Sequence, residues 1–368
     1  ILFSEYVTIR GILRCYRRFC IERIYSVSKT TTTFNLAHYL AQSGKKVLAV
    51  DADPQANLTE LMLAPTISEL DEKERESGEK YELGGTSLLE LLRPRIDGDV
   101  SEIELEKVVT VDVTPNLELL RGDVNLSSIE DSLAEAHIQR FSNKTHEKRT
   151  YVAIGDILNR FGEANEVDYI LIDVGPSSGA LTRACFLACD GYFVPTAPDR
   201  FNVQAIGTLS TIIKKWIKEH RQVFEEFAEL GLPIREGMPK FLGVILQNFK
   251  IRGGKPKPTY QMWMDRIPEK VASSLFPSIS QFNTQNKDLT SGLTDTDIVV
   301  TQIRDFEGLA PIMQECGKAM FDITKDDTRV TNEKGTAWSG VAWTQAQDRM
   351  ANYKGCIAQM AGNLENLL

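Results

Sequence analysis

Short apolar runs alternate with amphipathic segments along most of this chain of 368 residues. Residues 30–42 place apolar side chains at the spacing of one helix face, and the run 47–50 that follows ends at an aspartate. Four further runs have the same strand character: 117–120, 169–173, 191–195 and 241–246. Continuous apolar strands are typical of a parallel sheet covered on both faces. The alternation therefore predicts a doubly wound α/β fold with a mostly parallel sheet.

The segments between these runs also have a recognisable character. Gly44 follows the first predicted helix at the position where a left-handed residue commonly ends a helix. Residues 68–85 are polar and acidic, and we expect them to form an exposed, mobile connection. Helices are predicted at 87–92 and 126–136. The residues from Lys325 onward are polar with few apolar stripes, which predicts a peripheral helix.

Composition narrows the class of protein. Hydrophobic residues make up 42 % of the chain and charged residues 25 %, as in an average globular protein. No apolar run reaches the roughly 18–20 residues that span a bilayer. The six cysteines form no regular disulfide framework, so we expect reduced thiols. The four histidines form no pair with metal-ligand spacing, so we expect no structural zinc. We expect Cys185 and Cys189 to be buried apolar groups rather than ligands of an iron–sulfur cluster. A net charge of −9 argues against a surface made mainly for nucleic acid, but it allows a local basic patch.

The start of the first predicted helix has the residues of a phosphate-binding site. Lys29 and Thr30 are preceded by Ser28 and followed by Thr31. At a helix start, backbone N–H groups can hold phosphate, a lysine can reach the outer phosphates, and a threonine hydroxyl can bind Mg²⁺. Taken alone, so short a motif is more typical of a solvated helix start.

Carboxylates close two of the predicted strands. Asp51 and Asp53 follow the run 47–50, and Asp173 ends the run 169–173. Sheets of this class bind ligands at the carboxyl ends of their strands, and an acid there can hold a metal-bound water near phosphates. An Asp-Pro turn and a helix cap are the ordinary alternatives. In this order along one chain, the lysine–threonine motif and the two acidic strand ends predict a nucleotide site.

On these residues the chain resembles the ParA/Soj family of partition ATPases, which is related to MinD. The stretch KTTTTFNLAHYLAQSGKKVLAVDADPQANLT looks like the start of that family, and YILIDVGPSSGALTRACFLACDGYFVPTAPDRFNVQAI resembles its Walker B strand and the units that follow. Further matches are PNLELLRGDVNLSSIE, FLGVILQNF and IRDFEGLAPIMQECGKAMFDIT. The resemblance implies a P-loop NTPase fold. It predicts an atypical N-terminal segment at 1–26, an ATPase domain at 27–325 and a peripheral C-terminal helix or tail at 326–368.

The resemblance also implies roles for single residues. Lys29 would be the Walker lysine on the phosphates, and Asp53 would orient or activate the attacking water. Thr30 would bind Mg²⁺, with Asp51 near the metal and Asp173 as the Walker B aspartate. The implied cofactors are therefore ATP and Mg²⁺. The other nucleotide contacts would be Val27, Ser28, Thr31 and, at the adenine, Asn248.

The function that the resemblance implies is an ATP hydrolase acting as a dimerisation switch in plasmid or chromosome partition. The implied partners are a second copy of the chain on ATP binding, a ParB-like adaptor and non-specific DNA, at the nucleoid of a bacterial cytoplasm. A MinD-like positioning ATPase on a membrane is a lesser alternative. The final segment GCIAQMAGNLENLL has no lysine or arginine to form a basic amphipathic helix, so no membrane partner is expected.

Two basic clusters are candidates for DNA contact. One cluster lies on a predicted helix and consists of Lys214, Lys215, Lys218 and Arg221. The other lies in a loop rich in glycine and proline and consists of Lys250, Arg252, Lys255 and Lys257. Phosphate contacts by such side chains suffice for non-specific DNA binding. A solvated helix face is the equal alternative.

The chain departs from the family in its phosphate loop, which reads K-G-G-V-x-K-T-T in the family. Here Ile24 replaces the signature lysine, which in the family reaches the other subunit's nucleotide, and Tyr25 and Ser26 replace two glycines. The loop needs glycine for its backbone geometry and for close approach to phosphate. Either the chain is a degenerate member that acts as a catalytically impaired binding or scaffold protein, or residues 1–26 are not native sequence. We favour the second interpretation, because the match resumes abruptly at Val27.

Overall fold

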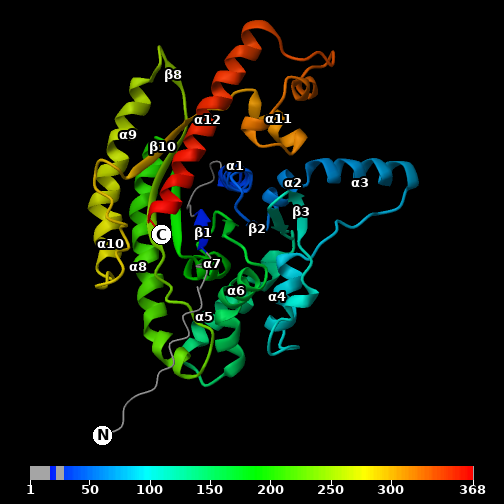
Figure 1. Cartoon of the computed structure of the whole chain (residues 1–368). Helices are drawn as coiled ribbons and strands as arrows, with labels where there is room; N and C mark the ends of the chain where they lie inside the picture. Colours follow the sequence, from blue (N-terminus) through cyan, green and yellow to red (C-terminus); the bar gives the residue numbers. More distant parts are fainter. Residues whose placement is uncertain (1–16, 22–28, 368) are drawn as a thin grey trace.

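An eight-stranded sheet runs through the middle of the molecule, with helices on both of its faces (Figure 1). The computed structural model describes residues 17–21 and 29–367. The strand order is β10-β7-β6-β1-β5-β2-β4-β3, and every neighbouring pair is parallel except β3–β4. The strands are β1 (Arg17–Ile21), β2 (Val47–Ala52), β3 (Val111–Thr114), β4 (Leu117–Leu120), β5 (Tyr169–Val174), β6 (Gly191–Thr196), β7 (Lys240–Phe249) and β10 (Val299–Arg304). The predicted doubly wound, mostly parallel α/β fold is confirmed.

Helices connect the strands and cover both faces of the sheet. They are α1 (Lys29–Gln42), α2 (Asn57–Met62), α3 (Ala64–Ser77), α4 (Leu88–Ile96), α5 (Glu130–Ile138), α6 (Thr145–Ala164), α7 (Ala180–Ala188), α8 (Arg200–Glu229), α9 (Pro258–Lys270), α10 (Phe276–Ser280), α11 (Leu309–Cys316) and α12 (Gly340–Leu367). A small hairpin of β8 (Ile251–Arg252) and β9 (Lys255–Pro256) precedes α9. Within the described part of the chain, no helix is both long enough and apolar enough to cross a membrane.

The two faces of the sheet bury alternate residues of the same strand. Leu48 and Val50 of β2 belong to a core that also contains side chains of α4, α6, α7 and α8. Val47 and Ala49 belong to a second core on the other face, formed with α1, α11 and α12. Successive side chains of a strand point to opposite faces. A strand buried on both faces is therefore apolar throughout, as the sequence pattern indicated.

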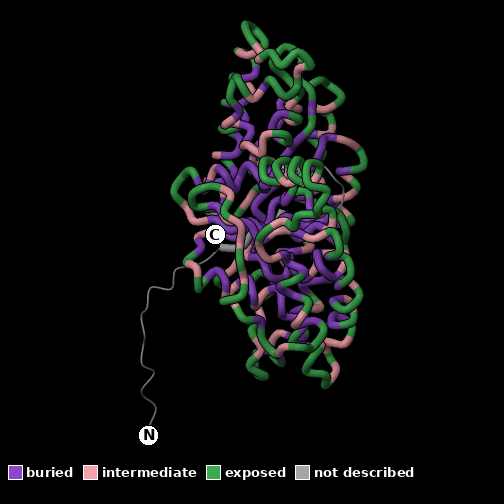
Figure 2. The backbone as a smooth tube through the Cα atoms, turned by 90° about the vertical axis from the view of Figure 1, so that its right-hand side faces the viewer, coloured by how far each residue is buried: buried purple, intermediate pink, exposed green. Residues whose placement is uncertain are grey.

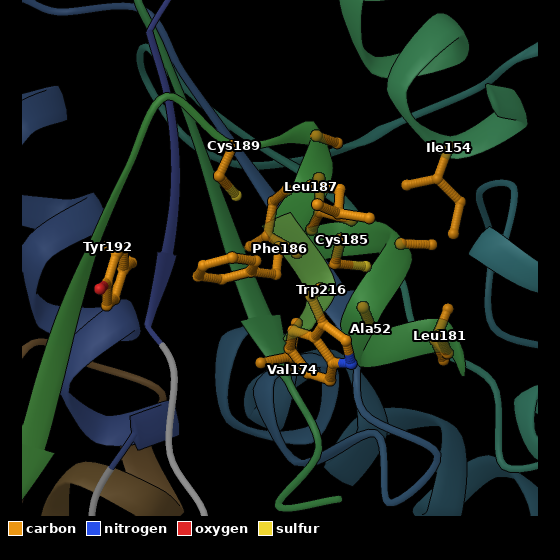
Figure 3. Packing of buried hydrophobic residues seen from close by; sticks show 14 of the residues in the cluster. Ala52, Ile154, Val174, Leu181, Cys185, Phe186, Leu187, Cys189, Tyr192 and Trp216 are labelled. Atoms are coloured by element: carbon orange, nitrogen blue, oxygen red, sulfur yellow. The ribbon is translucent and has the colours of Figure 1, made fainter. Parts of the chain in front are cut away.

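Figure 3 shows part of the first core, around α7 and the neighbouring strands. The rings of Phe186 and Trp216 pack there with their centroids 5.6 Å apart. Cys185 and Cys189 lie buried in the same core. Their expected role as small buried apolar groups is confirmed.

The local signals in the sequence correspond to observed elements. All five predicted strand runs form strands of the main sheet, as β2, β4, β5, β6 and β7, and residues 30–42 lie in α1. Gly44 has the left-handed φ of 81° expected after a helix. Ser87 caps α4, since its side chain accepts the N–H of Glu90 at 3.1 Å while Glu90 Oε2 accepts the N–H of Ser87 at 2.7 Å. Residues 126–136 form a 3₁₀ turn followed by most of α5.

Two expectations about elements are wrong. Within residues 68–85, the first ten lie in α3, a helix with no buried residue, and not in an irregular connection. Glutamate, lysine and arginine favour helices, and Gly78 ends this one in a left-handed conformation with φ 71°. High charge indicates exposure, which is confirmed, but it does not separate an exposed helix from a loop.

The segment after Lys325 also differs from its prediction. Its main element is α12, which does have an apolar stripe, spaced by four and three residues: Ala346, Met350, Tyr353, Ile357, Met360 and Leu364. This stripe is buried in the second core against α1 and β10. The prediction of a helix is confirmed, but the helix is an integral part of the core. Alanine, methionine and tyrosine between many polar residues made the stripe hard to recognise.

Candidate functional site

The carboxyl ends of β2 and β5 lie side by side, and α1 begins next to them. The two strands pair in a register that sets Asp51 directly opposite Asp173. The helix α1 packs on both strands, so its first residues lie at the same edge. Ligands of doubly wound sheets bind at the carboxyl ends of the strands. This edge is therefore the candidate site.

Thr30 and Asp173 are hydrogen-bonded across this edge. The Thr30 hydroxyl donates to Asp173 Oδ2 at 2.7 Å. Asp173 is fully buried, and its second oxygen, Oδ1, accepts no hydrogen bond from the described residues. Burial raises the pKa of Asp173 to about 7, against the opposing effect of the Lys29 ammonium. A buried carboxylate oxygen without a partner is costly for a protein, so it indicates a place for a cation or a metal-bound water.

Lys29 is the first residue of α1 and is buried, with an exposed fraction of 6 %. Its Nζ donates a hydrogen bond to the carbonyl oxygen of Val174, the last residue of β5. The ammonium therefore lies at the same strand end as Asp173. The N-terminus of a helix attracts anions through its free N–H groups, so a phosphate placed here would meet both the helix and the lysine.

A cleft of about 660 Å³ opens next to these residues. It is bounded by the start of α1, the loop after β2, the helix α2, the start of α3, and α11. The side chains that line it are Lys29, Thr30, Thr31, Asp53, Gln55, Asn57, Glu60, Leu61, Ala64, Ile67, Ser68, Pro176, Gln314 and Glu315. Small-molecule sites occupy about 300–1,000 Å³. The cleft therefore has room for a nucleotide.

Asp53 lies in the lining of this cleft and is 5 % exposed. Its Oδ1 accepts the N–H of Gln55 at 3.0 Å, which fixes the carboxylate. A Cβ atom at Gly175 would lie 3.3 Å from the same oxygen, so the glycine leaves room beside it. The structure therefore brings Asp53, Lys29 and Thr30 to one cleft, next to Asp173.

Asp51 does not line the cleft, and its contacts differ from the metal role that the resemblance implied. Asp51 Oδ2 accepts the N–H and the hydroxyl of Thr59 at 2.8 and 2.7 Å, and Oδ1 accepts the N–H of Asp53 at 3.2 Å. The Thr59 hydroxyl oxygen in turn accepts the N–H of Gly122 at 2.7 Å. Burial raises the pKa of Asp51 to about 6, and these hydrogen bonds oppose that shift. Both oxygens are therefore used by the protein, and the carboxylate ties α2 and the Asp53 loop to the sheet.

Sequence reasoning missed Thr59 and Gly122. A Cβ atom at Gly122 would lie 2.8 Å from both Cγ and Oδ2 of Asp51, so the chain needs a glycine there. Thr59 is only eight residues from Asp51, and a hydroxyl at the start of the next helix was a usable signal. Gly122 follows β4, the strand beside β2, and only the strand order shows that it lies near Asp51. Gln314 and Glu315 of α11 were missed for the same reason.

The remaining predicted nucleotide contacts lie at other places. Thr31 lines the cleft. Asn248 is an exposed residue of β7 with φ 57°, and it is not part of the cleft lining formed by described residues. Val27 and Ser28, like the substituted residues 24–26, lie outside the described residues. Their roles stay predictions.

The two predicted basic clusters are exposed and lie on separate elements. Lys214, Lys215, Lys218 and Arg221 lie on α8. The other cluster, at Lys250, Arg252, Lys255 and Lys257, lies on and next to the β8–β9 hairpin. Figure 1 shows the hairpin at the end of the molecule, beyond α9. The two basic clusters therefore form two separate surfaces, and each is exposed to solvent.

The residues at the sheet edge fit a magnesium ion shared with a nucleotide. Residues 17–21 and 29–367 contain no group of three His, Cys, Asp or Glu side chains that could hold a metal by themselves. Mg²⁺ in nucleotide sites usually takes one or two protein ligands and completes its shell with phosphate and water. The Thr30 hydroxyl and the Asp173 oxygen that accepts no hydrogen bond from the described residues would provide such a pair of ligands. Asp173 is buried beside the cleft and, like Asp51, is not among the residues that line it.

Comparison with known proteins identifies the family of the chain. The model of the AAA_31 family, described as an AAA domain, matches residues 26–225. The sporulation initiation inhibitor protein Soj of Bacillus subtilis is 28 % identical over 188 residues, which are 51 % of this chain and 60 % of Soj. This chain spans about half the length of the curated relatives that it matches.

Two solved structures share the fold. Apo McdA from Cyanothece has a TM-score of 0.57 at 18 % identity, over 93 % of this chain and 100 % of that one. A putative plasmid partition protein of Borrelia burgdorferi bound to AMPPNP has a TM-score of 0.52 at 16 % identity, over 94 % of this chain and 98 % of that one. At these identities the likeness concerns the fold.

A mostly parallel sheet with a lysine and a threonine at a helix start, facing an aspartate at a strand end, defines the class of P-loop ATPase folds. Within that class the chain belongs to the AAA_31 family and is a ParA/Soj-like member.

Proposed function

We propose that this protein binds ATP with Mg²⁺ in the cleft at the start of α1 and hydrolyses it. The observation that supports this most directly is the hydrogen bond from Thr30 to Asp173, with the second Asp173 oxygen left open and Lys29 at the same strand end. A bound Mg²⁺ would supply charge neutralisation at the phosphates. The AMPPNP in the Borrelia structure is consistent with the same ligand class.

Each side chain at this edge has a separate part in the proposal. Lys29 would bind the outer phosphates of ATP, and Thr30 and Asp173 would bind the Mg²⁺ ion or a water molecule attached to it. Asp53 lies in the cleft lining at a fixed position, where it can orient a water molecule for attack. Asp51 is a positioning residue, since its Oδ1 holds the backbone of Asp53 and its Oδ2 holds Thr59.

The three substitutions in the phosphate loop give the sharpest experiment on this proposal. We expect binding of a fluorescent ATP analogue with Mg²⁺ to be weak in the chain as written, and stronger by at least about tenfold in a variant with Ile24→Lys, Tyr25→Gly and Ser26→Gly. Lys29→Ala and Asp53→Ala in the restored loop are the controls. The first should lose binding, and the second should keep binding but lose hydrolysis.

The outcome separates two functions. If the restored loop hydrolyses ATP and Lys29→Ala abolishes this, the enzyme proposal stands. If neither loop gives turnover above that of Asp53→Ala, the chain acts as a binding or scaffold protein on an ATPase fold, the second candidate that the substitutions at 24–26 favour.

We further propose that the nucleotide controls dimerisation and non-specific DNA binding in plasmid or chromosome partition, with a ParB-like adaptor as the stimulating partner. The name of the Borrelia plasmid partition protein supports a role in partition, and the exposed basic clusters on α8 and the hairpin support DNA binding. DNA binding through phosphate contacts falls steeply with salt. Lys214→Glu with Lys218→Glu should weaken DNA binding in a mobility-shift assay, and salt-insensitive binding would contradict the proposal.

A further inference from the structure

The helix α3 is an exposed arm beside the cleft. None of its 14 residues is buried. Figure 1 shows it projecting from one side of the molecule, and Figure 2 looks onto that side, where an exposed helix crosses the front. An isolated helix of this length is marginal in water, so its stability depends on contacts elsewhere. Its first turns make such contacts, since Ile67 packs against the second core, whereas residues 71–77 contain no apolar side chain.

The root of the arm is fixed. Gly317, the residue that ends α11, has φ 56°, and a Cβ atom there would lie 2.8 Å from Pro65 Cδ and 3.2 Å from the carbonyl oxygen of Leu61. This close approach seats the junction of α2 and α3 on α11. At the far end, the N–H of Tyr81 donates to Glu74 Oε1 at 2.8 Å. The arm therefore has a defined direction, while its outer turns remain open.

Acidic side chains form a row along α3. Residues 69–82 contain seven acidic and three basic side chains, a net charge of −4. Glu69, Glu72 and Glu76 are exposed and follow the spacing i, i+3, i+7, which places them on one face of the helix. At about 1.5 Å per residue the row is about 10 Å long.

Basic side chains form a row of the same length on α8. Lys214, Lys218 and Arg221 are exposed and follow the spacing i, i+4, i+7. Read in the opposite direction, the row on α3 has the same spacing of four and then three residues. If the two helices lie antiparallel, each acidic residue of α3 faces a basic residue of α8. The three pairs are Glu76 with Lys214, Glu72 with Lys218 and Glu69 with Arg221.

We propose that the α3 arm of one copy of this chain docks antiparallel on the α8 row of a second copy. The two rows cannot meet within one molecule, because Figure 1 places α3 and α8 on opposite sides of the central strands. The contact joins different surfaces of the two copies, so it is heterologous and extends into open chains unless a rotation closes it. Exposed ion pairs contribute little each, so the association is weak and depends on salt.

The first test measures the mass of the full chain without nucleotide or DNA, by sedimentation velocity over a range of protein concentrations. Between about 0.1 M and about 1 M salt the screening length falls from about 10 Å to about 3 Å. We expect concentration-dependent association at the lower salt, weakened by at least about tenfold at the higher salt. A single monomer mass at both salt concentrations would overturn the proposal.

Charge reversal identifies the surfaces. An arm variant with Glu69→Lys, Glu72→Lys and Glu76→Lys should be monomeric, and so should a row variant with Lys214→Glu, Lys218→Glu and Arg221→Glu. An equimolar mixture of the two should associate again, because each altered surface finds its complement. All six residues are exposed, and circular dichroism checks that the folds are intact.

Matched controls complete the design. Asp71→Lys changes an exposed acid on the same helix outside the row, and Lys215→Glu changes an exposed lysine of α8 that lies 3.9 Å from Glu219. Both should associate like the unaltered chain. Equal association of the arm variant and the unaltered chain, or failure of the mixture to associate, would refute the pairing. The readout needs no ATP, so it is independent of the proposed nucleotide switch.

Discussion

Asp51 and Asp173 occupy matching positions in the sheet but have opposite surroundings. They lie opposite each other in the β2–β5 register, and both are fully buried. Both oxygens of Asp51 accept hydrogen bonds from protein donors. Asp173 has one oxygen bonded by Thr30 and, within the described part of the molecule, one with no donor. A carboxylate whose acceptors are filled by the protein holds the fold, whereas one with an open acceptor can serve a ligand.

The comparison is tested most severely by Asp51→Ala. Three donors, on Thr59 and Asp53, would lose their acceptor in a buried place. We expect the free energy of unfolding to fall by about 4 kcal/mol, measured by urea denaturation. Asp71→Ala, at an exposed acid, should change it by less than about 0.5 kcal/mol. A loss below about 1 kcal/mol for Asp51→Ala would show that the network is not structural.

Asp173→Asn should have the complementary effect, on the ligand rather than on the fold. Removing the charge opposite Thr30 should weaken Mg²⁺-dependent nucleotide binding by about 100-fold, or about 2.7 kcal/mol. Calorimetric titration with and without EDTA measures this, in the chain with the restored phosphate loop if the unaltered chain does not bind. Asp51→Asn should keep its response to Mg²⁺. If both variants lose the response to Mg²⁺ equally, the conclusion that Asp173 serves the ligand and Asp51 the fold is wrong.

Gly122→Ala tests the Asp51 network from its other end. The new methyl group would lie 2.8 Å from the carboxylate of Asp51 and would have to displace it. We expect a loss of about 2 kcal/mol in the free energy of unfolding, with the β4–β2 edge affected first. Gly355→Ala, on a helix with nothing within 4 Å of the added atom, is the matched control and should be neutral or slightly stabilising. Identical effects at the two glycines would argue against the close packing at Gly122.

Thr30 gives the smallest expected effect. Thr30→Ser keeps the hydroxyl that bonds Asp173 and should leave Mg²⁺-dependent binding within about threefold. Thr30→Val removes the hydroxyl at similar volume and should weaken binding by about tenfold, or 1.4 kcal/mol. The ratio of the two affinities is the measurement. A ratio near one would show that the hydroxyl does not participate in metal binding.

The sequence predicted the parts of the fold that depend on local pattern. Strands buried on both faces are apolar without interruption, so β2, β5, β6 and β7 were evident. The helix α1 followed from its spacing and from Gly44. Lys29, Thr30 and Asp173 were predicted together because each lies at a helix start or strand end, and the parallel sheet brings such ends to one edge.

The features that were missed depend on contacts between distant segments. Asp51 accepts hydrogen bonds from Thr59 and Asp53 and does not line the cleft. The N–H of Gly122 donates to the Thr59 hydroxyl, and Gly122 lies near Asp51 only because β4 lies beside β2. The stripe of α12 is defined by the surface it covers on α1 and β10 rather than by its own hydrophobicity. For α3, composition indicated exposure correctly, but propensity outweighed the expectation of a loop.

The strand β1 shows that a sheet and a loop place different demands on a sequence. Its backbone pairs with β5 on one side and β6 on the other, so it joins the two halves of the sheet. Those pairs use N–H and C=O groups, which every residue except proline provides, and Arg17–Ile21 contains no proline. A segment whose sequence departs from the family can therefore still form the strand that the sheet needs. An unbroken sheet therefore does not show that the chain binds a nucleotide, because strand pairing needs only backbone groups, whereas a phosphate loop also needs glycines, and the chain has Tyr25 and Ser26 in their place.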